Sequence, residues 1–143
     1  MTEGKEMKYL LIAGSRTFDD RETFNRVTKE FIDGEERFTV IVEGGAAGAD
    51  MMAREYAETH GMKVEEFRPD WKQFGRAAGP KRNDLMVKFI KEHNGAALYF
   101  WDEESKGTEQ CINSARRKGV DVTIWSTKRG GYICDGRGDL VLV

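Results

Sequence analysis

Glycines and polar side chains gather in four segments of this chain, each placed directly after a short apolar run. The segment at 43–50 reads Glu-Gly-Gly-Ala-Ala-Gly-Ala-Asp and precedes a helical pattern. Glycine permits close approach of a ligand, and the free N–H groups at a helix start attract anions such as phosphate. The segment lacks the Lys-Ser/Thr of a P-loop and the first glycine of GxGxxG. It indicates either an anion site at Gly44, Gly45 and Gly48, or a tight turn capped by Asp50.

The segment at 102–108 has the same character. Ser105, Gly107 and Thr108 precede another helical pattern, so their hydroxyls and amides suit a second phosphate or a ribose. The alternative is that Thr108 only caps the helix. Two such segments on one edge of a sheet favour a nucleotide-like ligand.

The segment at 68–82 carries the positive charge. It holds five cations and one anion, a net charge of +4 that leaves −6 for the rest of a chain whose total is −2. A basic segment in an acidic protein favours an anionic ligand, while the overall balance argues against a general nucleic-acid coat. Trp71 supplies a ring either for stacking on a base or closing the pocket, or for packing within the protein, and Arg82 supplies charge for a phosphate.

Catalysis and metal binding have weaker support. Among the carboxylates expected at this edge, Glu43 at a strand end is the best candidate for general acid–base work. The cysteines, Cys111 and Cys134, form no CxxC pair, and no cluster has metal-ligand spacing. We therefore expect no metal and no cofactor.

Alternating patterns predict the elements that position these segments. Short apolar runs predict five strands, and helical spacing between them predicts four helices, which together imply parallel βαβ units. The third helix is expected to bury Leu85, Met86, Phe89 and Ile90. The fold class is thus α/β, a Rossmann-like doubly wound sheet that is mainly parallel. The predicted strands are Lys8–Ala13, Thr39–Val42, Lys63–Phe67, Ala96–Trp101 and Val120–Trp125.

The chain of 143 residues has the length of a single domain. We predict a domain over residues 1–126 and an extension over 127–143, in which Tyr132–Cys134 and Leu140–Val143 flank a turn typical of a hairpin. No apolar run reaches the ~20 residues that span a bilayer, and no leader is visible at the start. We expect a soluble, cytoplasmic protein that does not contact membranes.

Short motifs follow the apolar runs in a fixed order, and together they resemble the SLOG superfamily, specifically its YspA/YpsA-related branch. The resemblance extends from about Lys8 to Trp125. The superfamily also includes the Lonely Guy phosphoribohydrolases and the DNA-processing protein DprA. The motifs are Gly14-Ser15-Arg16, Gly44-Gly-Ala-Ala-Gly-Ala-Asp50, Asp70-Trp71, Gly75, Ala78-Gly-Pro-Lys-Arg-Asn83 and Gly107-Thr108.

The resemblance implies a Rossmann-like fold that binds a nucleotide-derived ligand related to AMP, ADP-ribose or NAD, often in stress, phage-conflict or defence settings. By position it assigns ligand contacts to Gly14, Ser15 and Arg16, to the glycine segment, and to Arg82 and Asn83. It also suggests a homodimer. Lonely Guy enzymes have a catalytic Glu where this chain has Cys111, and Glu109 stands two positions early.

Three functions remain open at this point. The first is a sensor or sequestering protein for the nucleotide ligand. The second is a nucleotide-processing hydrolase that cleaves an N-glycosidic or phosphate linkage through Glu43 or Glu109. The third is single-stranded nucleic-acid binding by analogy with DprA, against which the acidic total counts, so nucleic acid is not the expected partner.

Overall fold

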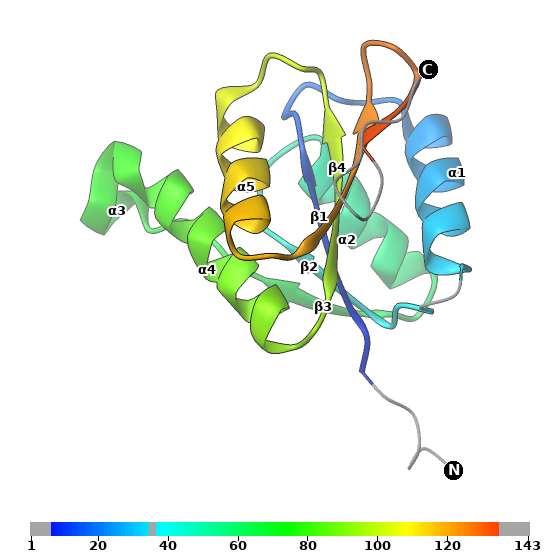
Figure 1. Ribbon diagram of the computed structural model, residues 1–143, viewed down its shortest axis with the longest axis horizontal. Helices are drawn as coiled ribbons and strands as arrows, with labels where there is room; N and C mark the ends of the chain where they lie inside the picture. The colour runs from blue at the N-terminus through cyan, green and yellow to red at the C-terminus, as the bar shows by residue number, and fades with distance from the viewer. Residues whose placement is uncertain (1–6, 35–36, 135–143) are drawn as a thin grey trace.

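The computed structural model describes residues 7–34 and 37–134, which form a six-stranded sheet with helices on both faces (Figure 1). The strand order is β3-β2-β1-β4-β5-β6, in which the first five are parallel and β6 runs antiparallel to β5. This confirms the predicted Rossmann-like α/β class. The strands are β1 (Tyr9–Gly14), β2 (Val40–Glu43), β3 (Lys63–Glu66), β4 (Ala96–Trp101), β5 (Asp121–Ser126) and β6 (Gly131–Cys134).

The helices cover the sheet in two pairs. Helices α1 and α2 lie on one face, α4 and α5 lie on the other, and the short α3 projects beyond the edge (Figure 1). Each pair packs on its own core, because alternate residues of a strand face opposite sides, as Leu10 and Leu11 of β1 do. The helices are α1 (Arg21–Ile32), α2 (Ala49–Thr59), α3 (Trp71–Phe74), α4 (Ala78–Glu92) and α5 (Lys106–Arg117), with a 3₁₀ turn at Gly75–Ala77 before α4.

The sixth strand extends the predicted sheet. Tyr132 pairs with Trp125 across β5 and β6, and their rings meet edge-on with centroids 5.0 Å apart. The antiparallel partner of Tyr132–Cys134 is therefore β5. The predicted partner Leu140–Val143 lies outside the described residues.

The interior of α4 differs from the prediction at two residues. Met86 and Ile90 are buried as expected, but Leu85 is 57% exposed, Phe89 is half-buried, and Val87 is buried instead. The helix begins at Ala78, so Pro80 lies in its first turn. The inward stripe therefore includes Arg82, Asn83, Met86 and Val87, two of which are polar and invisible to a purely apolar pattern.

The helix caps differ from the two that the sequence suggests, Asp50 and Thr108. Asp20 caps α1 by accepting a hydrogen bond from the Thr23 N–H. Helix α2 has Gly48 as its cap residue, and α5 has Ser105, so Asp50 and Thr108 both lie inside their first turns and are buried. None of the helices in the described part of the chain is long and apolar enough to cross a membrane.

Candidate functional site

The strand order reverses between β1 and β4, and a cavity of about 390 Å³ opens at the carboxyl edge beside this point. In open α/β sheets this crevice is the usual ligand position. We call it the edge cavity. Nine of the thirteen predicted ligand residues line it: Gly14, Arg16, Asp50, Trp71, Arg82, Asn83, Ser105, Gly107 and Thr108.

The remaining four lie elsewhere. Gly44 and Gly45 line a second cavity of about 310 Å³ beside the first, which we call the side cavity. Ser15 is buried, and its hydroxyl accepts a hydrogen bond from the Asp102 N–H at 3.3 Å. Gly48 has φ of 74°, and a Cβ there would overlap the Ser15 carbonyl oxygen. Ser15 and Gly48 therefore hold the loops after β1, β2 and β4 together.

The amides of the glycine segment bind carboxylates of the same chain. The N–H groups of Gly44 and Ala46 donate to Asp50 Oδ2 at 3.1 and 3.3 Å. The Gly45 N–H donates to Glu43 Oε1 at 2.6 Å. The first amides of this loop thus already have carboxyl oxygens as acceptors, and a ligand phosphate must find its donors elsewhere in the cavity.

Asp50 is 3% exposed and lies on the wall of the edge cavity. Burial raises its pKa to about 6, although the Arg82 guanidinium and the amides of Ala46 and Gly44 oppose the rise. Asp50 therefore exchanges its proton near neutral pH and is the one predicted carboxylate that also faces the edge cavity.

Arg82 and Asn83 lie on the same wall, and both are buried. Arg82 Nη1 donates to the Gly44 carbonyl oxygen, and its Nε donates to Asn83 Oδ1 at 2.8 Å. Asn83 Nδ2 in turn donates to Gln110 Oε1 at 2.8 Å and to the Gly107 carbonyl oxygen at 3.3 Å. These two side chains therefore join the glycine loop, α4 and α5 into one wall.

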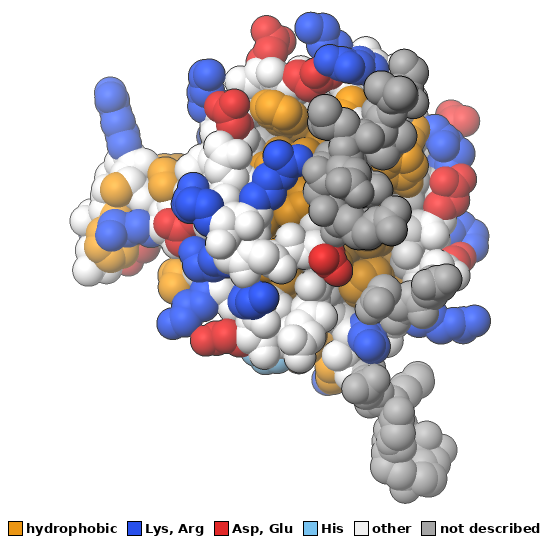
Figure 2. All heavy atoms as spheres, in the orientation of Figure 1, with side chains coloured by type: hydrophobic (Ala, Val, Ile, Leu, Met, Phe, Trp, Pro, Cys, Tyr) orange, Lys and Arg blue, Asp and Glu red, His pale blue; other side chains and the backbone are white. Residues whose placement is uncertain are grey.

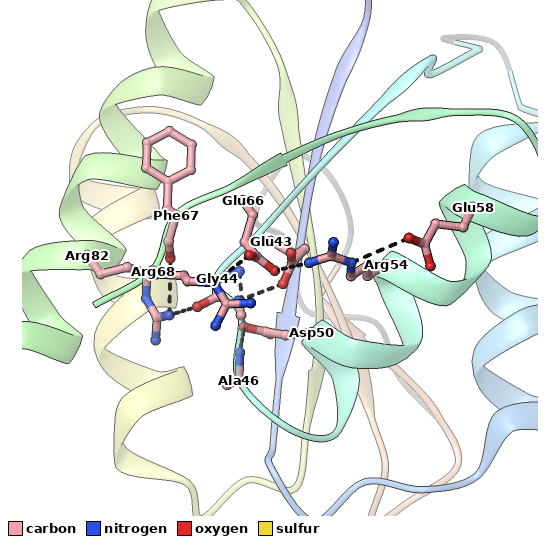
Figure 3. Close-up of polar contacts among 11 residues, drawn as sticks. Glu43, Gly44, Ala46, Asp50, Arg54, Glu58, Glu66, Phe67, Arg68 and Arg82 are labelled. Atoms are coloured by element: carbon pink, nitrogen blue, oxygen red, sulfur yellow. Dashed lines mark hydrogen bonds and ion pairs between the residues drawn. The ribbon is translucent and has the colours of Figure 1, made fainter. Parts of the chain in front are cut away.

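The carboxylate of Glu43 points behind the glycine loop toward Glu66, as Figure 3 shows. Its residue is 1% exposed and lines neither cavity. Burial, followed by the hydrogen bond and negative charge of Glu66, raises the pKa of Glu43 to about 8. A protonated Glu43 can donate to Glu66, which also accepts from Arg54 at 2.6 Å and from Arg68 at 2.7 Å.

The other predicted catalytic carboxylate is also absent from both cavity walls. Glu109 lies in the first turn of α5 and forms an ion pair with Lys106 at 3.7 Å. Neither Glu43 nor Glu109 is therefore positioned to touch a ligand in the edge cavity.

The wall of the edge cavity also includes three polar or charged residues that were not predicted as ligand contacts, namely Thr17, Arg76 and Asp102. Burial raises the pKa of Asp102, but the amides of Ser105 and Glu104 and the Ser15 hydroxyl outweigh that effect and keep it lowered. Two signals were available in the sequence, since Arg76 belongs to the basic segment and Asp102 follows a strand directly.

Trp71 stands between the two cavities and lines both. It is 49% exposed and is the first residue of α3. The part of the molecule around α3 projects from the rest in Figure 2 and has apolar and basic side chains at its surface. A Cβ on Gly79 would lie 3.5 Å from the ring, in ordinary contact, so the indole lies against the start of α4. The ring is thus held at the cavity mouth while much of its face stays open.

A doubly wound sheet with a polar cavity at its strand-order switch defines a Rossmann-like ligand-binding domain. Residues 9–74 match the YspA, cpYpsA-related SLOG family. The gene 61 protein of Mycobacterium phage D29 is 32% identical over 129 residues, which cover 85% of this chain and 99% of that protein. The chain belongs to the YspA, cpYpsA-related SLOG family, and this membership implies a nucleotide-derived ligand in general.

A solved structure shares the fold. The DNA processing protein A (DprA) from Streptococcus pneumoniae superposes with a TM-score of 0.66 at 17% sequence identity. The match covers 82% of this chain and 50% of that chain, so this chain corresponds to about half of the larger protein. At this identity the likeness establishes the common fold.

Proposed function

We propose that the protein binds a nucleotide-derived ligand of the AMP, ADP-ribose or NAD type in the edge cavity and acts as a sensor or sequestering protein. The observation that carries this proposal is the meeting of the α5 start with Arg16 and Arg76 on one cavity wall. The first N–H groups of a helix have no partner within the helix, and they favour an anion together with the arginines.

The cavity offers a partner for each part of a nucleotide. Arg16, Arg76 and the α5 start suit the phosphate, and the carboxylates of Asp50 and Asp102 suit ribose hydroxyls. The open face of Trp71 suits the base, since aromatic stacking accepts any base. The volume of about 390 Å³ falls in the range of ~300–1,000 Å³ typical of small-molecule sites.

Titration calorimetry with AMP, ADP-ribose and NAD tests the proposal. Arg16→Ala should weaken binding by about 1.5–3 kcal/mol, because a charge-assisted hydrogen bond to phosphate is lost. Arg117→Ala is the matched control, since Arg117 is exposed at the opposite end of α5. The proposal fails if none of the three ligands binds, or if the two variants weaken binding equally.

A nucleotide-processing hydrolase is the second candidate, and Asp50 is the observation that favours it. Its carboxyl group lines the cavity with a pKa raised to about 6, which suits general acid–base catalysis near neutral pH. Asp50→Asn discriminates the two functions, because it preserves an acceptor for the loop amides but cannot exchange a proton. Turnover of a panel nucleotide that disappears in this variant while binding persists would make the protein an enzyme.

A further inference from the structure

The side cavity differs from the edge cavity in the charge of its wall. Its lining holds Arg16, Arg68 and Arg82 and, within the described part of the chain, no carboxylate. The edge cavity has three arginines as well, but Asp50 and Asp102 balance two of them. The side cavity is therefore the more cationic of the two and suits a group with negative charge.

The two cavities are neighbours with a shared boundary. Arg16, Ala46, Trp71 and Arg82 line both. Arg82 is fixed by its hydrogen bonds to Gly44 and Asn83, whereas Arg16 and Trp71 are exposed. A ligand that crosses this boundary would place its middle beside the Arg16 guanidinium and the open face of the Trp71 indole.

Each cavity also has an arginine of its own. Arg76 lines the edge cavity alone, and Arg68 lines the side cavity alone. Arg68 is held from behind, since its Nε donates to Glu66 Oε1 at 2.7 Å while its side chain remains 69% exposed. The guanidinium is thus oriented by Glu66 and still open to a ligand.

We propose that the ligand is a dinucleotide, with one nucleotide unit in the edge cavity, the second in the side cavity and the linking phosphate at Arg16. This inference rests on the proposed function and names the class of ligand. Volumes of about 390 and 310 Å³ are each large enough for a small-molecule unit. Joining two sites through one ligand strengthens binding, because the second unit binds within the same molecule.

Calorimetry on the full chain with AMP, NAD and 5′-phosphorylated diadenylate tests this proposal. Diadenylate carries a 3′–5′ phosphate link and NAD a pyrophosphate link, so the better ligand identifies the linkage. Both dinucleotides, or the one with the fitting linkage, should bind the wild type at least about tenfold more tightly than AMP.

Arg68→Ala and Arg76→Ala form the matched pair of variants. Arg76→Ala should weaken AMP and the dinucleotide alike, by about tenfold or more. Arg68→Ala should leave AMP within about twofold and remove the advantage of the dinucleotide, and Arg68→Lys should restore part of it because the charge returns. Thermal denaturation of each variant separates an effect on the site from an effect on the fold.

Several outcomes overturn the inference. If AMP binds as tightly as either dinucleotide, or if Arg68→Ala changes no ligand's affinity, the side cavity takes no second unit, while the proposed function stands on the AMP result. If Arg68→Ala weakens AMP as much as the dinucleotide, Arg68 acts on the edge cavity and the division between the cavities is wrong. If no nucleotide binds at all, both proposals fall.

Discussion

Replacement of Glu43 by Gln should remove a pH dependence from the free energy of unfolding. The Glu43 carboxyl group is buried behind the glycine loop, where its proton can be donated to Glu66. Its pKa is raised from 4.5 to about 8 in the fold, mainly by burial. The folded chain therefore holds a proton that the unfolded chain releases at neutral pH.

The sign and size of the effect follow from this difference. The stability that the raised pKa contributes is fully present below pH 4.5 and is lost as the pH rises through about 8. Between about pH 6.5 and pH 8 the loss should amount to about 1.5 kcal/mol, since each unit of pKa difference corresponds to about 1.36 kcal/mol. The raised pKa of Asp50 also stabilises the fold at low pH, but this contribution is lost as the pH rises through about 6, below the window.

Urea unfolding monitored by fluorescence at several pH values measures this loss. The wild type should lose about 1.5 kcal/mol across the window. The loss in Glu43→Gln should be smaller than in the wild type by about 1.5 kcal/mol, because the Gln amide donates to Glu66 at any pH. Glu65→Gln is the matched control on the neighbouring strand β3, where the side chain is exposed, and it should keep the wild-type slope. If the free energy of unfolding changed with pH equally in the wild type and in Glu43→Gln, the raised pKa of Glu43 would be refuted.

Further substitutions test the wall and the loops. Arg82→Ala should destabilise the fold by about 2–3 kcal/mol in urea unfolding, since buried partners lose a charged donor, and a loss of ligand binding without this destabilisation would contradict its structural role. It should also raise the pKa of Asp50 further, because Arg82 lowers it. Gly48→Ala should cost about 2–4 kcal/mol, as its φ of 74° and the nearby Ser15 carbonyl both disfavour a Cβ. Gly107→Gln should keep the melting temperature, because a Cβ there meets nothing within 4 Å, but should reduce nucleotide binding in calorimetry; unchanged binding would remove Gly107 from the site.

The sequence predicts the sheet well because its signal is local. A buried parallel strand is a continuous apolar run, and Ala96–Trp101 matches its strand to the residue. The buried face of α4 is harder to predict, because it includes the polar residues Arg82 and Asn83. A search for apolar spacing selects the exposed Leu85 instead and misses both polar residues. A polar side chain turned inward by hydrogen bonds leaves no hydrophobic period to detect.

The candidate site was predictable in position but less so in the role of each residue. Motif order places the glycine segment at the cavity, yet only the fold shows that Asp50 and Glu43 occupy its first amides. The same holds for Arg82, whose charge suggests a phosphate contact while its hydrogen bonds to the Gly44 and Phe67 carbonyl oxygens join α4 to the loops after β2 and β3. Arg76 and Asp102 reach the cavity through tertiary packing, which spacing along the chain does not encode.

An NMR titration of the ¹⁵N-labelled protein with AMP and NAD tests the central claim most directly, because it shows where a nucleotide binds. The amide signals of Arg16, Gly107 and Thr108 at the edge cavity should shift in a saturable manner. The amide signals of Asn94 and Gly119, which follow the C-terminal ends of α4 and α5 far from the edge cavity, should not shift. Saturable shifts confined to other surfaces, or none at high nucleotide concentration, would contradict a nucleotide site at the carboxyl edge.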